Sequence, residues 1–326
     1  MTETGKSRLS SVSMRLAPWI VSVLIFFYIF KKYSPSQLLS SLRYVHFPFF
    51  IGYVLAYFLL SWLLDCWSLS KLLNRFGLRV SLSEILPLRM ATYLVMILNY
   101  GAASGLFALF LKKKRIPVFK SGGLMAFVMM IDFYLTFSLA FTGSFLTDVR
   151  LNGVLLNPTV RWLWAAATAV IVTLIILSKL SKREAEHPLI RRLRSFDLLH
   201  VFHDAGWKDY ATGMLLRSPI HVMVSTSLFF IAMTYGVHLP FFSVISNLPL
   251  IILIGVIPIT PGGLGTVQLA TVELFRDHLT GPIIDQGVPA SEILLSMSLL
   301  SLLANYTLKA IVGSFFLGRI SNSRGA

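Results

Sequence analysis

Apolar and polar residues occur in long blocks along the chain, and most of the apolar blocks are near 20 residues long. About that many helical residues are needed to cross the roughly 30 Å hydrocarbon core of a bilayer. The pattern therefore predicts six membrane-spanning helices. We expect them at residues 16–33, 47–69, 119–146, 159–179, 219–236 and 290–318.

Two further apolar blocks are each interrupted near the middle. Block 86–111 contains an asparagine followed by small residues, and block 240–279 contains Thr-Pro-Gly-Gly-Leu-Gly at 260–265. Proline cannot donate a backbone hydrogen bond and glycine readily adopts positive φ, so helix cannot run smoothly through 260–265. We expect a break between two half-helices facing protein or water, since lipid cannot satisfy the freed backbone groups. The alternative is an interfacial loop between two ordinary spans.

The distribution of the 29 lysines and arginines favours one arrangement of block 86–111. If this block returns to the side from which it entered, the basic residues at the N-terminus and in 70–89, 112–120 and 179–217 share one side. That side then holds most of the positive charge, whereas a crossing block divides the charge more evenly. The positive-inside rule therefore favours a re-entrant block, with both termini cytoplasmic.

The predicted order is span, span, hairpin and span, followed by the same order again. Because each half has an odd number of crossings, halves 16–146 and 159–318 form an inverted repeat. We therefore predict an all-α polytopic membrane protein with about six full spans and two re-entrant broken-helix hairpins. It is a single domain over residues 1–326, with a cytoplasmic amphipathic loop at 180–217. Inverted repeats with matching broken helices are a recurrent plan of secondary transporters.

Composition and charge further limit the classes of function that the chain could have. Hydrophobic residues make up 56% of the chain, and the mean hydropathy is +0.74. The net charge of +15 lies in short loops beside apolar blocks, which indicates membrane orientation and anionic-lipid contact rather than nucleic-acid binding. The single cysteine, Cys66, provides no disulfide or metal set. His200, His203 and Asp204 have a metal-like spacing without further ligands, so we interpret them as a solvated helix face.

No P-loop, zincin motif or Ser/His/Asp set is evident, so we expect no enzyme activity, no catalytic residues, no metal and no cofactor.

The sequence Ile-Pro-Ile-Thr-Pro-Gly-Gly-Leu-Gly at 257–265 resembles the lysylphosphatidylglycerol synthase transmembrane family. These are flippase-like membrane domains, found alone or fused to a synthetase or glycosyltransferase. The break near residue 100 and the basic loop before the last third of the chain also fit. We expect no aminoacyl-transferase domain after residue 326, and therefore do not expect aminoacyl-lipid synthesis.

This chain departs from the family pattern at three places. Gln268 stands where the family usually has a glutamate, and the first break lacks the usual proline and arginine. The last span has Asn305 and Lys309 where an arginine is common. The resemblance therefore supports an inference about the fold more directly than one about the substrate.

Ionisable and polar side chains inside spans are energetically costly, and they often mark functional sites. Asp132 lies in the middle of a span. It is predicted either to couple protons or contact a headgroup, or to form a buried structural pair with Arg89 or Lys309. Asp65 lies nearer a span end and is predicted to be structural.

The break at 260–265 offers backbone amides at the start of a half-helix, where an anionic group is stabilised. Alternatively, its glycines only let helices pack closely. The predicted substrate-binding residues are Asn99, Asp132, Thr260, Pro261, Gly262, Gly263, Gly265, Gln268, Glu273 and Asn305.

The predicted function is movement of a phospholipid or a polyprenyl-linked anionic lipid between the leaflets of the cytoplasmic (inner) membrane. The expected partners are anionic phospholipid or polyprenyl phosphate. The alternative is a non-catalytic membrane subunit or scaffold for a separate lipid-modifying synthetase or glycosyltransferase. An intramembrane enzyme is a third and weaker alternative.

Overall fold

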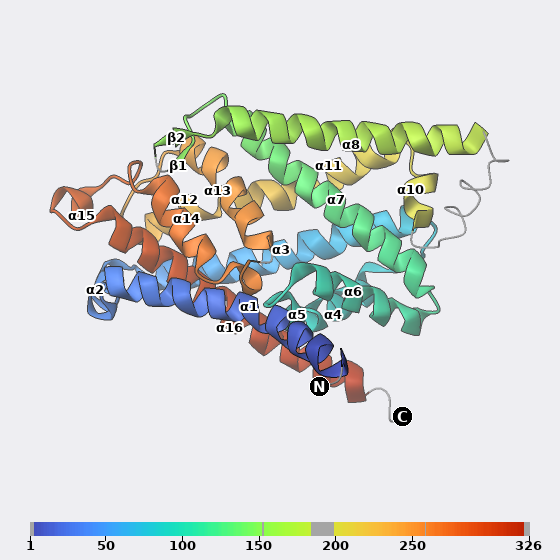
Figure 1. The fold of residues 1–326 in the computed structure, drawn as a ribbon, viewed down its shortest axis with the longest axis horizontal. Helices are drawn as coiled ribbons and strands as arrows, with labels where there is room; N and C mark the ends of the chain where they lie inside the picture. Colours follow the sequence, from blue (N-terminus) through green and yellow to red (C-terminus); the bar gives the residue numbers. More distant parts are fainter. Residues whose placement is uncertain (1–2, 152, 184–198, 258, 323–326) are drawn as a thin grey trace.

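The computed structural model describes residues 3–151, 153–183, 199–257 and 259–322. The described residues form helices joined by loops, together with a short antiparallel hairpin of strands β1 (Arg150–Leu151) and β2 (Val154–Leu155). Long helices run side by side along the longest axis of the molecule (Figure 1). The all-α polytopic membrane fold is therefore confirmed.

Five helices in the described part of the chain are long and apolar enough to cross a membrane. They are α3 (Phe47–Arg75), α7 (Val118–Gly143), α8 (Asn157–Arg183), α11 (Trp207–Ser225) continuing as α12 (Ser227–Thr234), and α16 (Ala290–Asn322). They cover five of the six predicted spans. Helix α1 (Glu3–Lys32) covers the remaining one at 16–33 but is not among these five, so the count of six stays a prediction.

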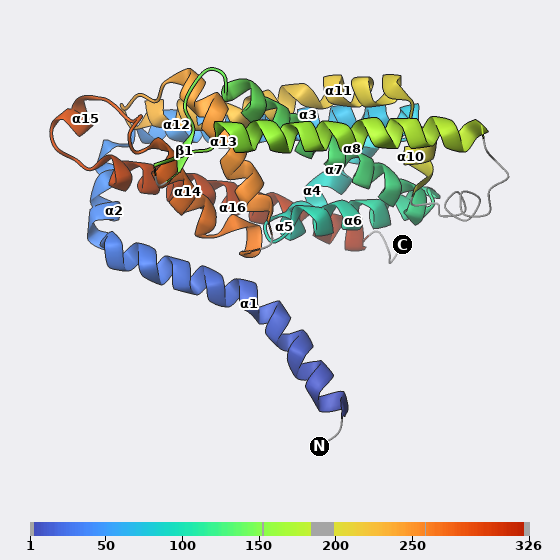
Figure 2. The same cartoon turned by 45° about the horizontal axis from the view of Figure 1, so that its top comes forward.

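The N-terminal part of α1 extends away from the other helices (Figure 2). It is followed by α2 (Pro35–Ser41) and a 3-10 turn, η1 (Leu42–Tyr44). The Ser34 hydroxyl begins α2 by accepting a hydrogen bond from the Gln37 N–H at 3.3 Å. The C-terminal half of α1 contacts the remainder of the protein. Ile29 is buried in the hydrophobic core, and the Ser22 hydroxyl donates to the Leu264 carbonyl at 3.1 Å.

The first broken segment forms a helical hairpin of α4 (Leu82–Ala91), α5 (Tyr93–Met96) and α6 (Tyr100–Leu111), followed by a 3-10 turn, η2 (Lys112–Lys114). Asn99 begins α6, because its Oδ1 accepts a hydrogen bond from the Ala102 N–H at 2.8 Å. Lys114 Nζ lies 2.7 Å from Glu84 Oε1, so the two ends of the hairpin meet. This segment therefore returns to the side of the molecule at which it starts, as predicted for 86–111.

The same ion pair changes the acidity of Glu84, which lies outside the spanning helices. The hydrogen bond from Lys114, followed by those from the Ser81 backbone and hydroxyl, lowers the pKa of the Glu84 carboxyl to about 2. This carboxyl is therefore charged throughout the neutral pH range.

The second broken segment is also a hairpin, made of α13 (Phe241–Val256), η4 (Pro261–Gly263) and α14 (Thr266–Phe275). At its base, His238 and Thr280 exchange two backbone hydrogen bonds of 2.8 and 3.0 Å. At its tip, Gly262 and Gly263 have φ values of 57° and 75°. The predicted break is therefore confirmed, and it depends on backbone angles that glycine adopts without strain.

The two hairpins enter the bundle from opposite ends and meet at their tips. Helix α4 starts and α6 ends at the end of the molecule where α7 begins, whereas α13 starts and α14 ends near β1 and β2 (Figure 1). A Cβ atom on Gly262 would lie 2.5 Å from the Ile97 carbonyl oxygen of the first hairpin. Entry from opposite ends is what an inverted repeat of 16–146 and 159–318 requires, although the repeat itself stays a prediction.

The polar loop is shorter than predicted. Residues 184–198 lie outside the described part of the chain, and α10 (His200–Asp204) precedes α11, which already starts at Trp207. Arg217 is therefore in the middle of a helix that is able to span the membrane, and the prediction that it belongs to the cytoplasmic loop is wrong. A short helix, α15 (Pro282–Asp285), precedes α16 at the opposite end of the molecule.

Candidate functional site

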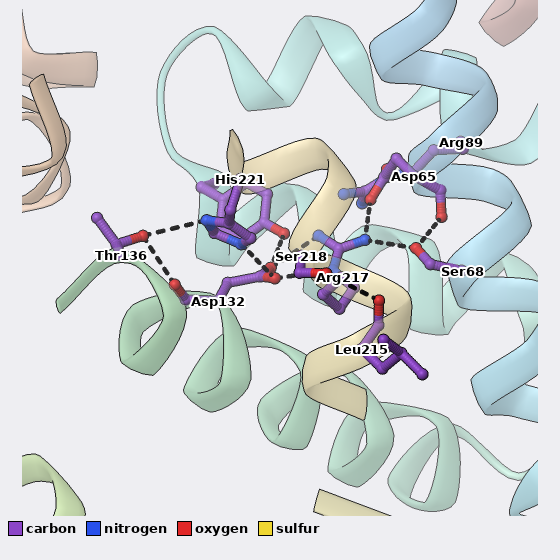
Figure 3. A network of polar contacts seen from close by, with 10 residues as sticks. Asp65, Ser68, Arg89, Asp132, Thr136, Leu215, Arg217, Ser218 and His221 are labelled. Atoms are coloured by element: carbon purple, nitrogen blue, oxygen red, sulfur yellow. Dashed lines mark hydrogen bonds and ion pairs between the residues drawn. The ribbon is translucent and has the colours of Figure 1, made fainter. Parts of the chain in front are cut away.

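A network of buried charged side chains lies between α3, α4, α7 and α11 (Figure 3). Arg217 of α11 is its centre. Its Nε and Nη2 donate to the two carboxylate oxygens of Asp132 at 2.7 and 2.8 Å. Its Nη1 donates to Asp65 Oδ1 at 2.5 Å and to Ser68 Oγ at 2.9 Å. One guanidinium therefore joins carboxylates from two spanning helices.

A second arginine, Arg89 of α4, shares one of these carboxylates. Its Nε donates to Asp65 Oδ2 at 2.5 Å, and its side chain is only 1% exposed. Its Nη1 is buried and has no hydrogen-bond partner among the described residues. An unpaired buried donor on a charged group is costly. Arg89 therefore keeps one hydrogen-bond donor that the described residues leave unpaired.

Asp132 accepts two further hydrogen bonds. Tyr100 Oη donates to its Oδ2 at 2.9 Å, and His221 Nε2 lies 2.9 Å from its Oδ1. The ion-pair partner of Asp132 is thus Arg217, and the predicted partners Arg89 and Lys309 are wrong. The physical reason is that Arg217 lies between Asp132 and Asp65, and that Arg89 reaches only Asp65.

Helical spacing explains how these side chains come together. Arg217 and His221 are four residues apart on α11, and Asp132 and Thr136 are four residues apart on α7, so each pair shares one helix face. Helix α11 starts early enough to include Arg217, because Asp209 Oδ2 accepts a hydrogen bond from the Gly206 N–H at 2.7 Å.

Sequence reasoning missed Arg217, His221 and Tyr100 as members of this network. The spacing of Arg217 and His221, which repeats that of Asp132 and Thr136, is the signal that could have found the first two. Asp65 was predicted to be structural, and the structure places it in a double ion pair.

A cavity of about 290 Å³ lies on one side of the network, between α3, α4, α5, α11, α12 and α16. Its polar lining comprises Arg89, Arg217, Lys309, Asp65, Asn305, Ser61, Ser227, Ser301 and four tyrosines, Tyr53, Tyr57, Tyr93 and Tyr100. Within the described chain, Lys309 forms no ion pair, and its Nζ lies 6.0 Å from the centre of the Tyr93 ring. Asn305 Oδ1 is buried without a hydrogen-bond partner. We call this the cationic cavity, because three cationic side chains and one carboxylate line it.

A second cavity of about 200 Å³ lies on the other side of the network, between α7, α11 and α13. Asp132, Thr136 and His221 line it together with apolar side chains such as Phe133 and Leu253. Arg217 and Tyr100 line both cavities. We call this second space the apolar cavity. The charged network is therefore the partition between the two cavities.

The predicted site residues fall into separate groups. Asp132 and Asn305 lie at the apolar and cationic cavities, respectively. The structure brings Asn99 together with Thr260, Pro261 and Gly262 around a further space of about 250 Å³ at the hairpin tips.

The other predicted residues of the second hairpin have packing or structural contacts. A Cβ on Gly263 would lie 2.6 Å from Val267 Cγ2, and one on Gly265 would lie 2.6 Å from Ile25 Cγ2. Gln268, in the first turn of α14, caps the start of that helix, since its Oε1 accepts a hydrogen bond from the Gly265 N–H at 2.7 Å. Glu273 forms an ion pair of 3.2 Å with Arg276. The role of each in substrate binding stays a prediction.

Metal-ligating side chains do not cluster in the residues that the structure describes. His200 Nδ1 and Asp204 Oδ2 lie 3.2 Å apart as neighbours on one helix.

The fold and the site together define a polytopic membrane protein with a charged centre between two internal cavities. A family model described as the lysylphosphatidylglycerol synthase TM region matches residues 15–313 of the chain. The chain belongs to this family, whose members are membrane proteins that act on lipids. Comparison with curated proteins and with solved structures gave no match.

Proposed function

We propose that the protein moves an anionic lipid between leaflets and holds the lipid phosphate in the cationic cavity. The observation that carries this proposal is the unpaired Nη1 of Arg89 at a cavity that Lys309 also lines. Arginine and lysine are the side chains best suited to bind phosphate oxygens. The half-buried Asn305 is close enough to share in orienting the headgroup, since it lines the same cavity.

The charge of the cavity favours an anion over a neutral ligand. Three cationic side chains and the Asp65 carboxylate line it, and the carboxylate already serves two arginines. A phosphodiester brings one negative charge and several acceptor oxygens. It would therefore offset the excess positive charge and pair the free donor of Arg89.

The surrounding helices offer a path for the acyl chains. Helices α3 and α16 both line the cavity, and their outer faces carry exposed apolar side chains, including Leu59, Leu303 and Ile311. A lipid could keep its chains against these faces while its headgroup occupies the cavity. The proposal thus assigns the headgroup to the cationic cavity and not to the break at 260–265.

The break would act indirectly in this proposal. Tyr306 of α16 donates a hydrogen bond to the Gly262 carbonyl at 3.4 Å, next to Asn305 in the sequence. The break therefore supports the helix that supplies Asn305 and Lys309.

We further propose a cytoplasmic (inner) membrane location with both termini cytoplasmic and no enzyme activity, as the basic loops and the lack of a catalytic motif suggest.

The test is lipid movement in vesicles of equimolar phosphatidylcholine and phosphatidylglycerol containing the purified protein. Phosphatidylglycerol with a fluorescent label on its acyl chain should change leaflet faster than the matching phosphatidylcholine. Lys309→Met keeps the side-chain length and removes the charge. Because a hydrogen bond to a charged group contributes about 1.5–3 kcal/mol, this variant should bind about tenfold more weakly or worse.

Lys112→Met provides the matched control, because Lys112 is exposed outside the cavity. It should move lipid at the wild-type rate. Equal rates for both lipids, or a Lys309→Met variant as active as wild type, would contradict the proposed site. A wild-type protein that moves no lipid at all would favour the subunit or scaffold alternative, with a synthetase or glycosyltransferase as its partner.

A further inference from the structure

We propose that binding of the anionic headgroup is coupled to the uptake of one proton by His221, so that lipid and proton move together. This inference rests on the proposed function, because it assumes that the phosphate occupies the cationic cavity. His221 lies on the opposite side of the charged partition and lines the apolar cavity.

The contacts around His221 can hold a protonated ring. Thr136 has a single hydroxyl hydrogen, which it donates to the Asp132 backbone carbonyl at 2.8 Å. Its oxygen can then accept from His221 Nδ1, which lies 3.2 Å away, when that nitrogen carries a proton. The Asp132 carboxylate can only accept, so His221 Nε2 must donate to it at 2.9 Å. An imidazolium, which has two N–H groups, can donate from both ring nitrogens in this arrangement.

The same residues also accommodate the neutral ring. If the proton leaves Nδ1, the Nε2–H can still donate to Asp132. The Thr136 hydroxyl can then turn from the Asp132 carbonyl and donate to Nδ1 instead. Histidine is the side chain that most often changes charge between about pH 5 and 8. His221 and Thr136 therefore form a site with two hydrogen-bonded states that differ by one proton.

Few other charged groups face His221. The titratable or charged groups near it are Asp132 from α7, Arg217 from α11, Tyr100 from α6, and Asp65 of α3 through Arg217. Helix α13 presents only the apolar side chains of Ile252, Leu253 and Val256 to the cavity. The charge state of His221 therefore acts mainly on Asp132 and, through it, on Arg217.

Arg217 connects this proton site to the lipid site, because it lines both cavities. When His221 is neutral, Arg217 is the one charged partner that Asp132 has among the described residues. When His221 is protonated, Asp132 has a second cationic partner, and Arg217 is freer to share its donors with a phosphate. The added proton and the added phosphodiester charge also cancel. Protonation should therefore strengthen anion binding, and binding should favour protonation.

The test is calorimetric titration of the full-length protein in phosphatidylcholine nanodiscs with dihexanoyl phosphatidylglycerol. Titrations at several pH values, in two buffers with different ionisation enthalpies, give the number of protons taken up per lipid. For wild type we expect up to one proton, with affinity rising by as much as tenfold per pH unit toward acid. His221→Gln should bind with an affinity that does not depend on pH, and without proton uptake.

His238→Gln is the matched control, because His238 is exposed and the hairpin base uses only its backbone. It should reproduce the wild-type pH profile. A His221→Gln protein that keeps the pH dependence, or a wild-type protein that binds lipid without proton uptake, overturns the coupling and leaves the proposed function standing. Absence of phosphatidylglycerol binding at every pH refutes the proposed function, and the coupling with it.

A second variant covers the case in which His221→Gln does not fold. Thr136→Val removes the acceptor of Nδ1–H, and a hydrogen bond from a charged ring is stronger than one to a neutral ring. The proton uptake should therefore move to lower pH, and Thr136→Ser should restore the wild-type profile. An unchanged profile in Thr136→Val also overturns the proposal.

Discussion

Neutralising Asp132 should destabilise the protein strongly. In Asp132→Asn, the charge that balances Arg217 is lost, while the shape of the side chain is kept. Arg217 and Arg89 would then share the single Asp65 carboxylate in a buried environment. Lipid movement should also fall, because Arg217 lines the cationic cavity.

The contacts of Asp132 set the size of the effect. Arg217 donates two hydrogen bonds to its carboxylate, and Tyr100 and His221 each contribute one more. Each hydrogen bond to a charged group contributes about 1.5–3 kcal/mol to stability. The amide oxygen of the asparagine can still accept some of these bonds, so part of their contribution remains. We therefore expect a loss of about 3–5 kcal/mol, which is the usual cost of breaking a buried ion pair by removing one partner.

This loss of stability is measured by heating the protein in detergent and recording the amount of folded protein that remains at each temperature. The double variant Asp132→Asn with Arg217→Gln should be more stable than the sum of the single effects predicts, because no unbalanced charge remains. Asp148→Asn is the control, since Asp148 is 62% exposed in its ion pair with Arg150. A wild-type melting temperature in Asp132→Asn, or strict additivity in the double variant, would refute the reasoning.

Three further changes test the hairpins. Gly263→Ala should lower the melting temperature and lipid binding together, because a Cβ there meets neighbouring atoms at a φ of 75°; a loss of binding alone would instead indicate an anion site. Cysteines at Lys112 and Gln286 should be labelled from opposite sides of the membrane, and labelling of both from outside intact cells would contradict the proposed orientation. Glu84→Gln should remove the part of the stability that wild type loses between about pH 4.5 and 2, which is measured as melting temperature against pH. The lowered pKa, caused first by Lys114, makes the carboxylate stabilising above that window and ineffective below it.

The hairpins could be predicted from the sequence because their determinants are local. Proline and glycine at 260–265 and the asparagine at 99 act on their own backbone, and the structure places breaks at both points. The basic residues of the first hairpin favoured a return to the same side, and the Glu84–Lys114 ion pair joins its two ends.

The partners within the charged network could not be predicted in the same way. An aspartate in an apolar block indicates that a cation must lie near it, but the sequence does not say which one. Arg217 follows a polar stretch, so hydropathy alone assigns it to a loop. It is 85 residues from Asp132 and 152 from Asp65, and only the packing of α11 against α3 and α7 brings the three together.

The central claim is that the cationic cavity binds a lipid phosphate. An electron cryomicroscopy structure of the protein in nanodiscs containing phosphatidylglycerol tests it most directly. We predict phosphate density within hydrogen-bond distance of Arg89 Nη1 and Lys309 Nζ, which should disappear in Lys309→Met. Phosphate density at Pro261 and Gly262, with none in the cationic cavity, would contradict the claim.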